Sequence, residues 1–194
     1  MRKTFLVIIL SMLITSIFAA PFGLKMGMTI KEIEKQCEEK PIFVKDDIYM
    51  IIPIKSHPLF EYYAVYVNEK AGLYRIRART ESITVNKYGT ELQNDFNIIK
   101  DRIAKTYGEP RIIDEIDKNS IWKGNNYWFT ALREGARVLS AVWGEKKQLA
   151  DNLDSVTLDC VADDNLLAYD KGYLHLSYYF NNAKSVEDEQ DSVF

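Results

Sequence analysis

Two stretches of the chain repeat apolar residues every three or four positions, which is the spacing of one helix face. The first begins after Thr29, with Glu32 three residues on, and the second begins after Thr90, with Gln93 three residues on. Both pairs fit a capping box at a helix N-terminus. The sequence therefore predicts two helices, which bury Ile30, Ile33 and Cys37 in the first and Leu92, Phe96, Ile99, Ile103 and Tyr107 in the second.

The segments that follow each helix alternate apolar and polar residues, the pattern of strands with one buried face. Turn residues at 68–72 and at 134–135 predict hairpins. The expected strands are Ile48–Ile54, Phe60–Val67, Leu73–Arg79 and Ile83–Val85 in the first half, and Tyr127–Arg133, Arg137–Trp143, Ser155–Val161 and Tyr173–Phe180 in the second. This order predicts an α+β fold, an antiparallel sheet with helices packed on one face, and fits two α-β-β-β repeats.

The same patterns divide the chain into four segments. Residues 1–20 have the features of a secretory signal peptide, because two basic residues precede a short apolar run that ends in small residues. Residues 21–86 form the first helix-plus-strands half and residues 87–180 the second. Residues 181–194 are acidic and lack apolar periodicity, so we expect a disordered tail; an acidic docking tail is the alternative.

The leader predicts a periplasmic or secreted protein. An uncleaved anchor is the alternative, but the apolar run is shorter than the roughly 20 residues of a bilayer span, so no stable span is expected after cleavage. Cleavage removes Arg2 and Lys3, which lowers Lys plus Arg from 25 to 23 against 28 Asp plus Glu and moves the net charge from −3 to −5. This acidic balance argues against nucleic acid as a partner.

Export also permits a disulfide. Cys37 and Cys160 are the only cysteines in the chain. Each falls on a predicted apolar face, and we predict that the two are joined. Two buried free thiols are the alternative, since cysteine packs well as a small hydrophobe. The chain has no C-x-x-C pair, so a redox-active dithiol is not indicated.

The composition excludes several classes of protein. With 194 residues, 47% hydrophobic and 27% charged, the chain fits an ordinary globular domain or two small halves rather than a fibrous or wholly disordered protein. It lacks the common motifs for hydrolysis, phosphate binding and dinucleotide binding. His57 and His175 have no nucleophile in a recognisable frame, and residues 46–47 and 163–165 lack the ligand spacing of a calcium loop. We therefore predict no catalytic residues, no metal site and no cofactor.

One predicted strand carries a row of cations. Arg75, Arg77 and Arg79 alternate with Tyr74, Ile76 and Ala78, so the three guanidinium groups line one face about 7 Å apart. They are candidates for binding an acidic partner or an anion. Pairing within the chain, with acids such as Glu61 and Glu81, is the alternative.

Aromatic residues are the second surface feature. Tyr63, Tyr173 and Tyr179 fall on strand faces that are otherwise polar or mixed. Exposed tyrosine on a rigid sheet favours protein contacts, so these three join the arginines as candidate binding residues. Partial burial at the sheet edge is the alternative.

The run from Pro21 to Thr29, together with Tyr107-Gly108-Glu109-Pro110 after the second helix, resembles a group of small exported bacterial proteins of unknown function, some carried by phages or prophages. The Gly-Met-Thr helix opening and the repeated helix-then-strands order are also similar to the small outer-membrane assembly lipoproteins and to the β-lactamase-inhibitor-like repeat. The resemblance implies a binding or inhibitory module rather than an enzyme. The lipidation cysteine of the assembly lipoproteins is missing here.

These observations predict an exported, non-enzymatic protein that binds another protein in the bacterial envelope, as an inhibitor, immunity or exclusion factor. Two alternatives stay open. The first is a periplasmic binder of a small anionic ligand, and the second is an envelope hydrolase that acts through His57 or His175 with a carboxylate.

Overall fold

A computed structural model describes residues 20–145 and 147–191, so the predicted signal peptide lies outside the described residues apart from Ala20. The predicted α+β class is confirmed. The helices are α1 (Ile30–Glu34), α2 (Thr90–Tyr107), α3 (Trp128–Arg133) and α4 (Ala183–Asp191), with 3-10 turns η1 (Pro21–Gly23), η2 (Asn125–Tyr127) and η3 (Leu166–Ala168). The strands are β1 (Ile42–Lys45), β2 (Ile48–Ile51), β3 (Tyr62–Asn68), β4 (Gly72–Arg79), β5 (Ile83–Thr84), β6 (Arg111–Ile116), β7 (Arg137–Trp143), β8 (Leu153–Ala162) and β9 (Lys171–Phe180).

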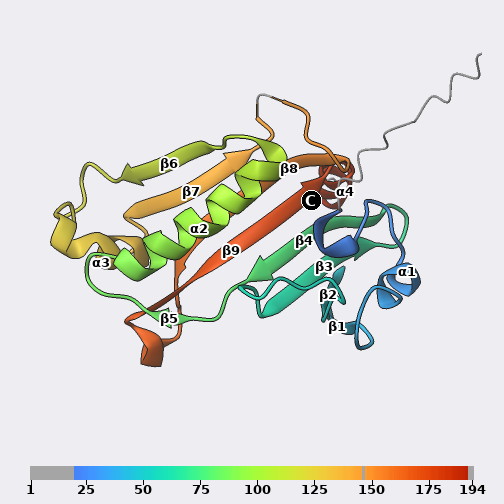
Figure 1. Ribbon diagram of the computed structural model, residues 1–194, viewed down its shortest axis with the longest axis horizontal. Coiled ribbons are helices and arrows are strands. Elements are labelled where there is room, and N and C mark those ends of the chain that lie inside the picture. Colours follow the sequence, from blue (N-terminus) through green and yellow to red (C-terminus); the bar gives the residue numbers. More distant parts are fainter. Residues whose placement is uncertain (1–19, 146, 192–194) are drawn as a thin grey trace, which may run out of the picture.

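One antiparallel sheet contains all of these strands. Its order is β1-β2-β3-β4-β9-β8-β7-β6, and the short β5 pairs with β9 (Figure 1). The strands from β1 to β4 form one meander after α1, and those from β6 to β9 form a second meander after α2. Each helix is thus followed by a meander of four paired strands, of which the outermost, β1 in the first and β6 in the second, was not predicted.

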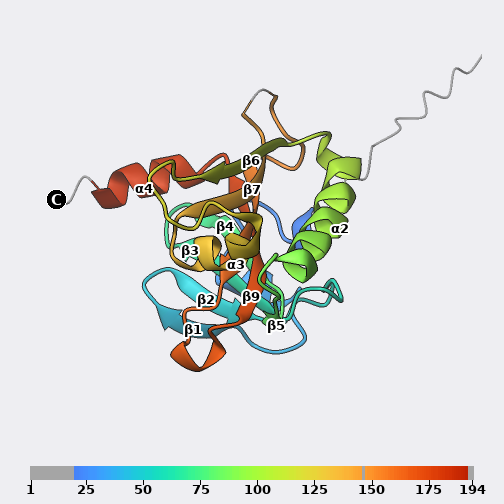
Figure 2. The same cartoon turned by 90° about the vertical axis from the view of Figure 1, so that its left-hand side faces the viewer.

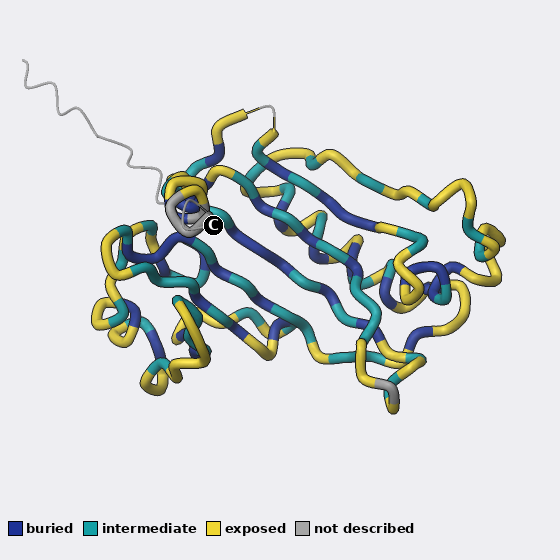
Figure 3. The backbone as a smooth tube through the Cα atoms, turned by 180° about the vertical axis from the view of Figure 1, so that it is seen from behind, coloured by how far each residue is buried: buried dark blue, intermediate teal, exposed yellow. Residues whose placement is uncertain are grey.

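The long helix α2 packs against β8 and β9 on one face of the sheet, whereas α4 lies on the other face beside β4 (Figure 2). We expected the helices on one face of the sheet, but they lie on both. We call the face opposite α2 the open face. Seen from that side, the central strands are uncovered apart from the end where α4 crosses (Figure 3).

The main core lies between α2 and the sheet. The predicted stripe of α2 is confirmed, since Leu92, Phe96, Ile99 and Ile103 are all buried. Opposite them, β8 and β9 contribute Val156, Leu158, Leu174 and Leu176, each at most 1% exposed. Burial of this apolar area is the main term that holds the helix on the sheet.

The two helix starts differ. The capping box at α1 is confirmed, because the Glu32 carboxylate accepts the Thr29 N–H at 2.8 Å. The box predicted at Thr90 is wrong. Gly89 precedes α2 in a left-handed conformation, and the Gln93 side chain instead donates to the Tyr88 carbonyl at 2.8 Å.

The strand predicted at Tyr127–Arg133 is wrong, because this segment forms η2 and α3. Its buried residues are Trp128, Phe129, Ala131 and Leu132. Positions spaced by one, three and four residues share one helix face, whereas a strand would bury alternate residues only. Gly135 then ends α3 with φ +67° rather than joining two strands.

The segment expected to be a disordered acidic tail forms α4 as far as Asp191. Ala183 and Val186 are buried in a small cluster with Tyr74, which holds the helix on the open face. The Asn182 side chain also donates to the carbonyls of Ala71 and Leu73 at 3.0 and 3.2 Å. Only two apolar residues and one amide hold this segment, which is too few to form a periodic pattern in the sequence.

The predicted disulfide is wrong, because Cys37 and Cys160 are both free and buried. Cys37 pairs with Pro53 next to β2, and Cys160 lies in β8. Four strand spacings separate β2 from β8, about 19 Å at the usual interstrand distance, whereas a disulfide needs Cα atoms within about 7 Å. The Cys37 thiol donates to the Ile33 carbonyl at 3.2 Å, and burial raises the pKa of the Cys160 thiol.

We therefore expect two reduced thiols in the purified protein. Iodoacetamide should add two groups per chain after unfolding in denaturant without reductant, and should react far more slowly with the native protein because both thiols are buried. Mass spectrometry of the intact chain measures both results. A chain that accepts no label in denaturant until it is reduced would contradict the separation of the two cysteines.

The left-handed turn at Gly89 provides a second prediction. A Cβ on Gly89 would lie 1.9 Å from a ring carbon of Trp128, whereas a Cβ on Gly135, at a similar φ, meets nothing within 4 Å. Gly135→Ala should cost about 1–2 kcal/mol from backbone strain alone, and Gly89→Ala should cost about 3 kcal/mol or more because the overlap adds to the strain. Urea unfolding of the two variants measures the difference, and equal costs would show that the Trp128 contact is unimportant.

Candidate functional site

The arginine row on β4 lies on the open face near the centre of the sheet. Arg75, Arg77 and Arg79 are all partly exposed. On one side β4 pairs with β3, and on the other it pairs with β9, so Arg75 lies opposite Tyr179 and Arg79 lies opposite His175. The paired strands on both sides fix the positions of the three side chains.

Tyrosine rings from β3 and β9 contact the guanidinium groups. The Cζ of Arg75 lies 4.3 Å from the ring centroid of Tyr179, and that of Arg79 lies 3.7 Å from Tyr173. Tyr66 is shared, at 5.1 Å from Arg75 and 5.3 Å from Arg77. Such cation–π contacts contribute about 0.5–1 kcal/mol each at partly exposed positions, and they hold the arginines without neutralising them.

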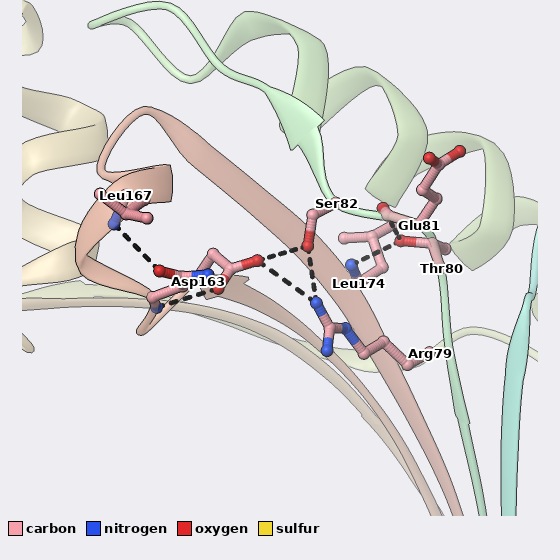
Figure 4. A network of polar contacts seen from close by, with 8 residues as sticks. Arg79, Thr80, Glu81, Ser82, Asp163, Leu167 and Leu174 are labelled. Carbon is pink, nitrogen blue, oxygen red and sulfur yellow. Dashed lines mark hydrogen bonds and ion pairs between the residues drawn. The ribbon is translucent and has the colours of Figure 1, made fainter.

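Arg79 also has an internal ion pair. Its Nη2 lies 3.4 Å from Asp163 Oδ2, and Ser82 Oγ lies 2.6 Å from each of these two atoms (Figure 4). The pKa of Asp163 is lowered by the Ser82 hydroxyl, the Asn165 backbone N–H and Arg79. The alternative of pairing within the chain named acids such as Glu61 and Glu81, but the acid that pairs with Arg79 comes from the β8–β9 connection. Arg79 is therefore tied to the fold.

Arg77 differs from Arg79 in its partners. Among the residues that the structure describes, no carboxylate forms an ion pair with Arg77 and no hydrogen bond to its guanidinium is found. Its Nε is buried and has no hydrogen-bond partner in the same part of the chain. Arg77 therefore offers an uncompensated charge and unused N–H donors at the centre of the row, which favours an anionic partner.

His175 adjoins the row from β9. Burial and the charges of Arg77, Arg75 and Arg79 lower its pKa to about 4. The imidazole is therefore neutral at pH 7 and adds no charge to the site. A neutral histidine beside three arginines can accept or donate a hydrogen bond to a bound partner.

A β-bulge alters the pattern at the start of β4. Tyr66 pairs with Arg75 and Val67 pairs with Leu73, so Tyr74 is the extra residue. Tyr74 was expected to share a face with Ile76, but the bulge turns it to the open face, where it packs with Tyr66 and α4. The bulge therefore allows α4 to cover the end of the arginine row.

The structure places two of the three predicted tyrosines at the row. Tyr173 and Tyr179 contact arginines, but Tyr63 is 3% exposed and faces the α2 side, where its hydroxyl donates to the His57 carbonyl. Sequence reasoning missed Tyr62 and Tyr66. Alternation along β3 is the signal that would have found them, because these residues share a face that Tyr63 does not.

The groups on the open face surround an open hollow of about 350 Å³, between Tyr62, Tyr66, Arg77, Arg79, Tyr173 and His175. Its chemistry is that of an anion-binding surface with aromatic walls.

Within residues 20–145 and 147–191, no three His, Cys, Asp or Glu side chains gather in a way that could hold a metal ion. Over the same residues, no helix is long and apolar enough to cross a membrane.

The depressed pKa of His175 predicts a pH-dependent stability. The unfolded chain binds a proton near pH 6.5, but the folded chain does so only near pH 4, so acid favours the unfolded state in this window. His175→Gln should therefore gain stability relative to the wild type as the pH falls from 6.5 to 4, in urea unfolding at each pH. An unchanged difference between the two proteins across this window would contradict the assignment.

The same assignment has a control in the second histidine. Among the three arginines, Arg77 lowers the pKa of His175 most. Arg77→Gln should therefore raise the pKa of His175, which NMR of the ring protons measures. The pKa of His57, which burial and Arg102 lower, should stay the same.

Comparison of the chain with protein-family models, with curated proteins and with solved structures found no match. The site is therefore interpreted from its geometry alone, and the resemblance drawn from the sequence motifs stays a prediction.

Proposed function

We propose that this protein is an exported, non-enzymatic binding module whose open face holds an acidic segment of another protein in the bacterial envelope. An inhibitor, immunity or exclusion factor would act in this way. The observation that carries the proposal is Arg77, a cation that contacts the Tyr66 ring at the centre of the sheet and has no ion-pair partner among the described residues. The leader-like sequence at residues 1–20 supports export.

The geometry of the row suits an extended peptide. Alternate residues of β4 place their side chains about 7 Å apart, and alternate residues of any extended chain have the same spacing. An acidic residue of a partner segment would therefore lie at Arg77, and the residues two positions away on either side would lie beside Arg75 and Arg79. The rings of Tyr62, Tyr66 and Tyr173 supply rigid apolar area beside the charges, a combination that is enriched where proteins bind one another.

A small anion in the hollow is the second candidate, and it rests on the same guanidinium groups with the neutral His175. The two candidates differ in what each needs. A peptide gains affinity from several charges and rings along the row, whereas a small anion uses only Arg77 and its immediate neighbours.

A defined peptide tests the proposal. A labelled peptide of alternating Glu and Ser should bind the wild-type protein in fluorescence anisotropy at low salt, and weaken as salt is added because the contact is electrostatic. Arg77→Glu should weaken binding by about tenfold or more, through loss of a charge-assisted hydrogen bond and new repulsion. Arg102→Glu is the matched control, since Arg102 lies on α2 on the other side of the sheet, and it should have little effect.

Each result separates the candidates. Equal binding of a Lys and Ser peptide, or unchanged affinity in Arg77→Glu, would overturn the peptide proposal. A thermal shift with phosphate or sulfate that matches the shift with the peptide would favour the small-anion function instead.

A further inference from the structure

A second hollow lies on the α2 side of the sheet, away from the arginine row. Its volume is about 220 Å³. The walls are formed by apolar or aromatic side chains from η1, the loop before β3, α2 and β9, namely Phe22, Phe60, Ile99, Ile103, Leu176 and Tyr178. His57 and Arg102 also line it, together with Thr106 and Tyr107. An apolar cavity with a few convergent polar groups is the usual form of a small-molecule site.

The first polar group to consider in the cavity wall is the hydroxyl of Tyr178. It is 8% exposed, and its ring packs edge-on against Phe22 and Tyr107. Its hydroxyl forms no hydrogen bond with any residue that the structure describes. The hydroxyl is not among the fully buried polar atoms that lack a partner, so it is open to the cavity that Tyr178 lines. A molecule in the cavity, water included, can therefore hydrogen-bond to it.

His57 and Arg102 form the second polar feature of the cavity wall. Arg102 Nη1 lies 3.0 Å from His57 Nε2, and the Leu59 N–H donates to His57 Nδ1 at 3.3 Å. Both ring nitrogens thus face donors, but a neutral imidazole has only one acceptor nitrogen. Burial and Arg102 lower the pKa of His57, so the ring is neutral at pH 7. One of the two contacts is therefore unsatisfied.

An anion at this position resolves the conflict. With its proton on Nε2, His57 accepts from Leu59 through Nδ1 and donates from Nε2. The Nε2 proton and the Arg102 guanidinium then converge on a shared acceptor. No carboxylate within the described residues forms an ion pair with Arg102. Arg102 is exposed, so solvent or a bound molecule supplies the acceptor, and a carboxylate would accept from both groups at once.

We propose that this cavity binds a small amphipathic carboxylate, with its apolar body between α2 and β9 and its carboxylate at Arg102 and His57. The volume suits about eight to ten non-hydrogen atoms, judged against the 150 Å³ that benzene occupies in an engineered protein cavity. Medium-chain fatty acids fall in this range. The site is separate from the open face, so it stands or falls independently of the proposed peptide binding.

Methyl NMR of the protein with octanoate tests the proposal. Octanoate should shift the methyl signals of Ile99, Ile103 and Leu176 in a saturable way, and leave those of Ile112 and Val138 on the outer strands unchanged. Arg102→Gln should weaken octanoate binding by about tenfold, the effect of losing one charge-assisted hydrogen bond, and should leave the weaker binding of 1-octanol unchanged. Arg111→Gln is the matched control, because it removes an exposed arginine that does not line the cavity.

Tyr178→Phe keeps the ring and removes only the hydroxyl, so it should fold and bind octanoate a few-fold more weakly. The proposal is overturned if no saturable shift occurs up to about 10 mM octanoate. Water alone would then fill the cavity and bond to its polar groups. It is also overturned if octanol binds as well as octanoate, or if Arg102→Gln binds octanoate with unchanged affinity.

Discussion

The pairing of β4 with β9 is the contact on which the rest of the structure depends. It joins residues about 100 positions apart in the chain, from Arg75 with Tyr179 to Arg79 with His175. Through this pairing two four-stranded meanders become one sheet, and the arginine row moves from an edge to the interior. Tyr173, His175 and Tyr179 reach the row only because β9 lies beside β4.

The strand alternation of β9 serves both faces of the sheet at once. Leu174, Leu176 and Tyr178 point towards α2, while the residues between them point to the open face. Neighbours along the chain therefore belong to different surfaces: Tyr178 lines the apolar cavity and Tyr179 contacts Arg75. A shift of one residue in register would exchange the two sets, so the core packing of β9 also fixes the chemistry of both surfaces.

The sequence was sufficient where a pattern is local and repeated. The α2 stripe, the central strands and the row at Arg75, Arg77 and Arg79 follow directly from periodicity. It was insufficient where a contact with a distant segment decides the local structure. The Tyr74 bulge, the Asp163 pair of Arg79 and the packing of α4 through Val186 depend on segments distant in the chain. The strands β1 and β6 were missed because their burial patterns show little alternation. The disulfide prediction failed because the pattern that places two cysteines on buried faces does not show how far apart those faces lie.

The late position of β9 affects how the chain assembles. Strand β4 is made about 90 residues before β9, and during synthesis it stays an edge strand until the last strand of the sheet has emerged. Exposed edges invite pairing between chains. Like charges placed opposite one another destabilise such pairing, so the three arginines discourage two unfinished chains from joining through β4. When β9 arrives with tyrosines at the matching positions, the same charges gain ring contacts that a second copy of β4 would not offer.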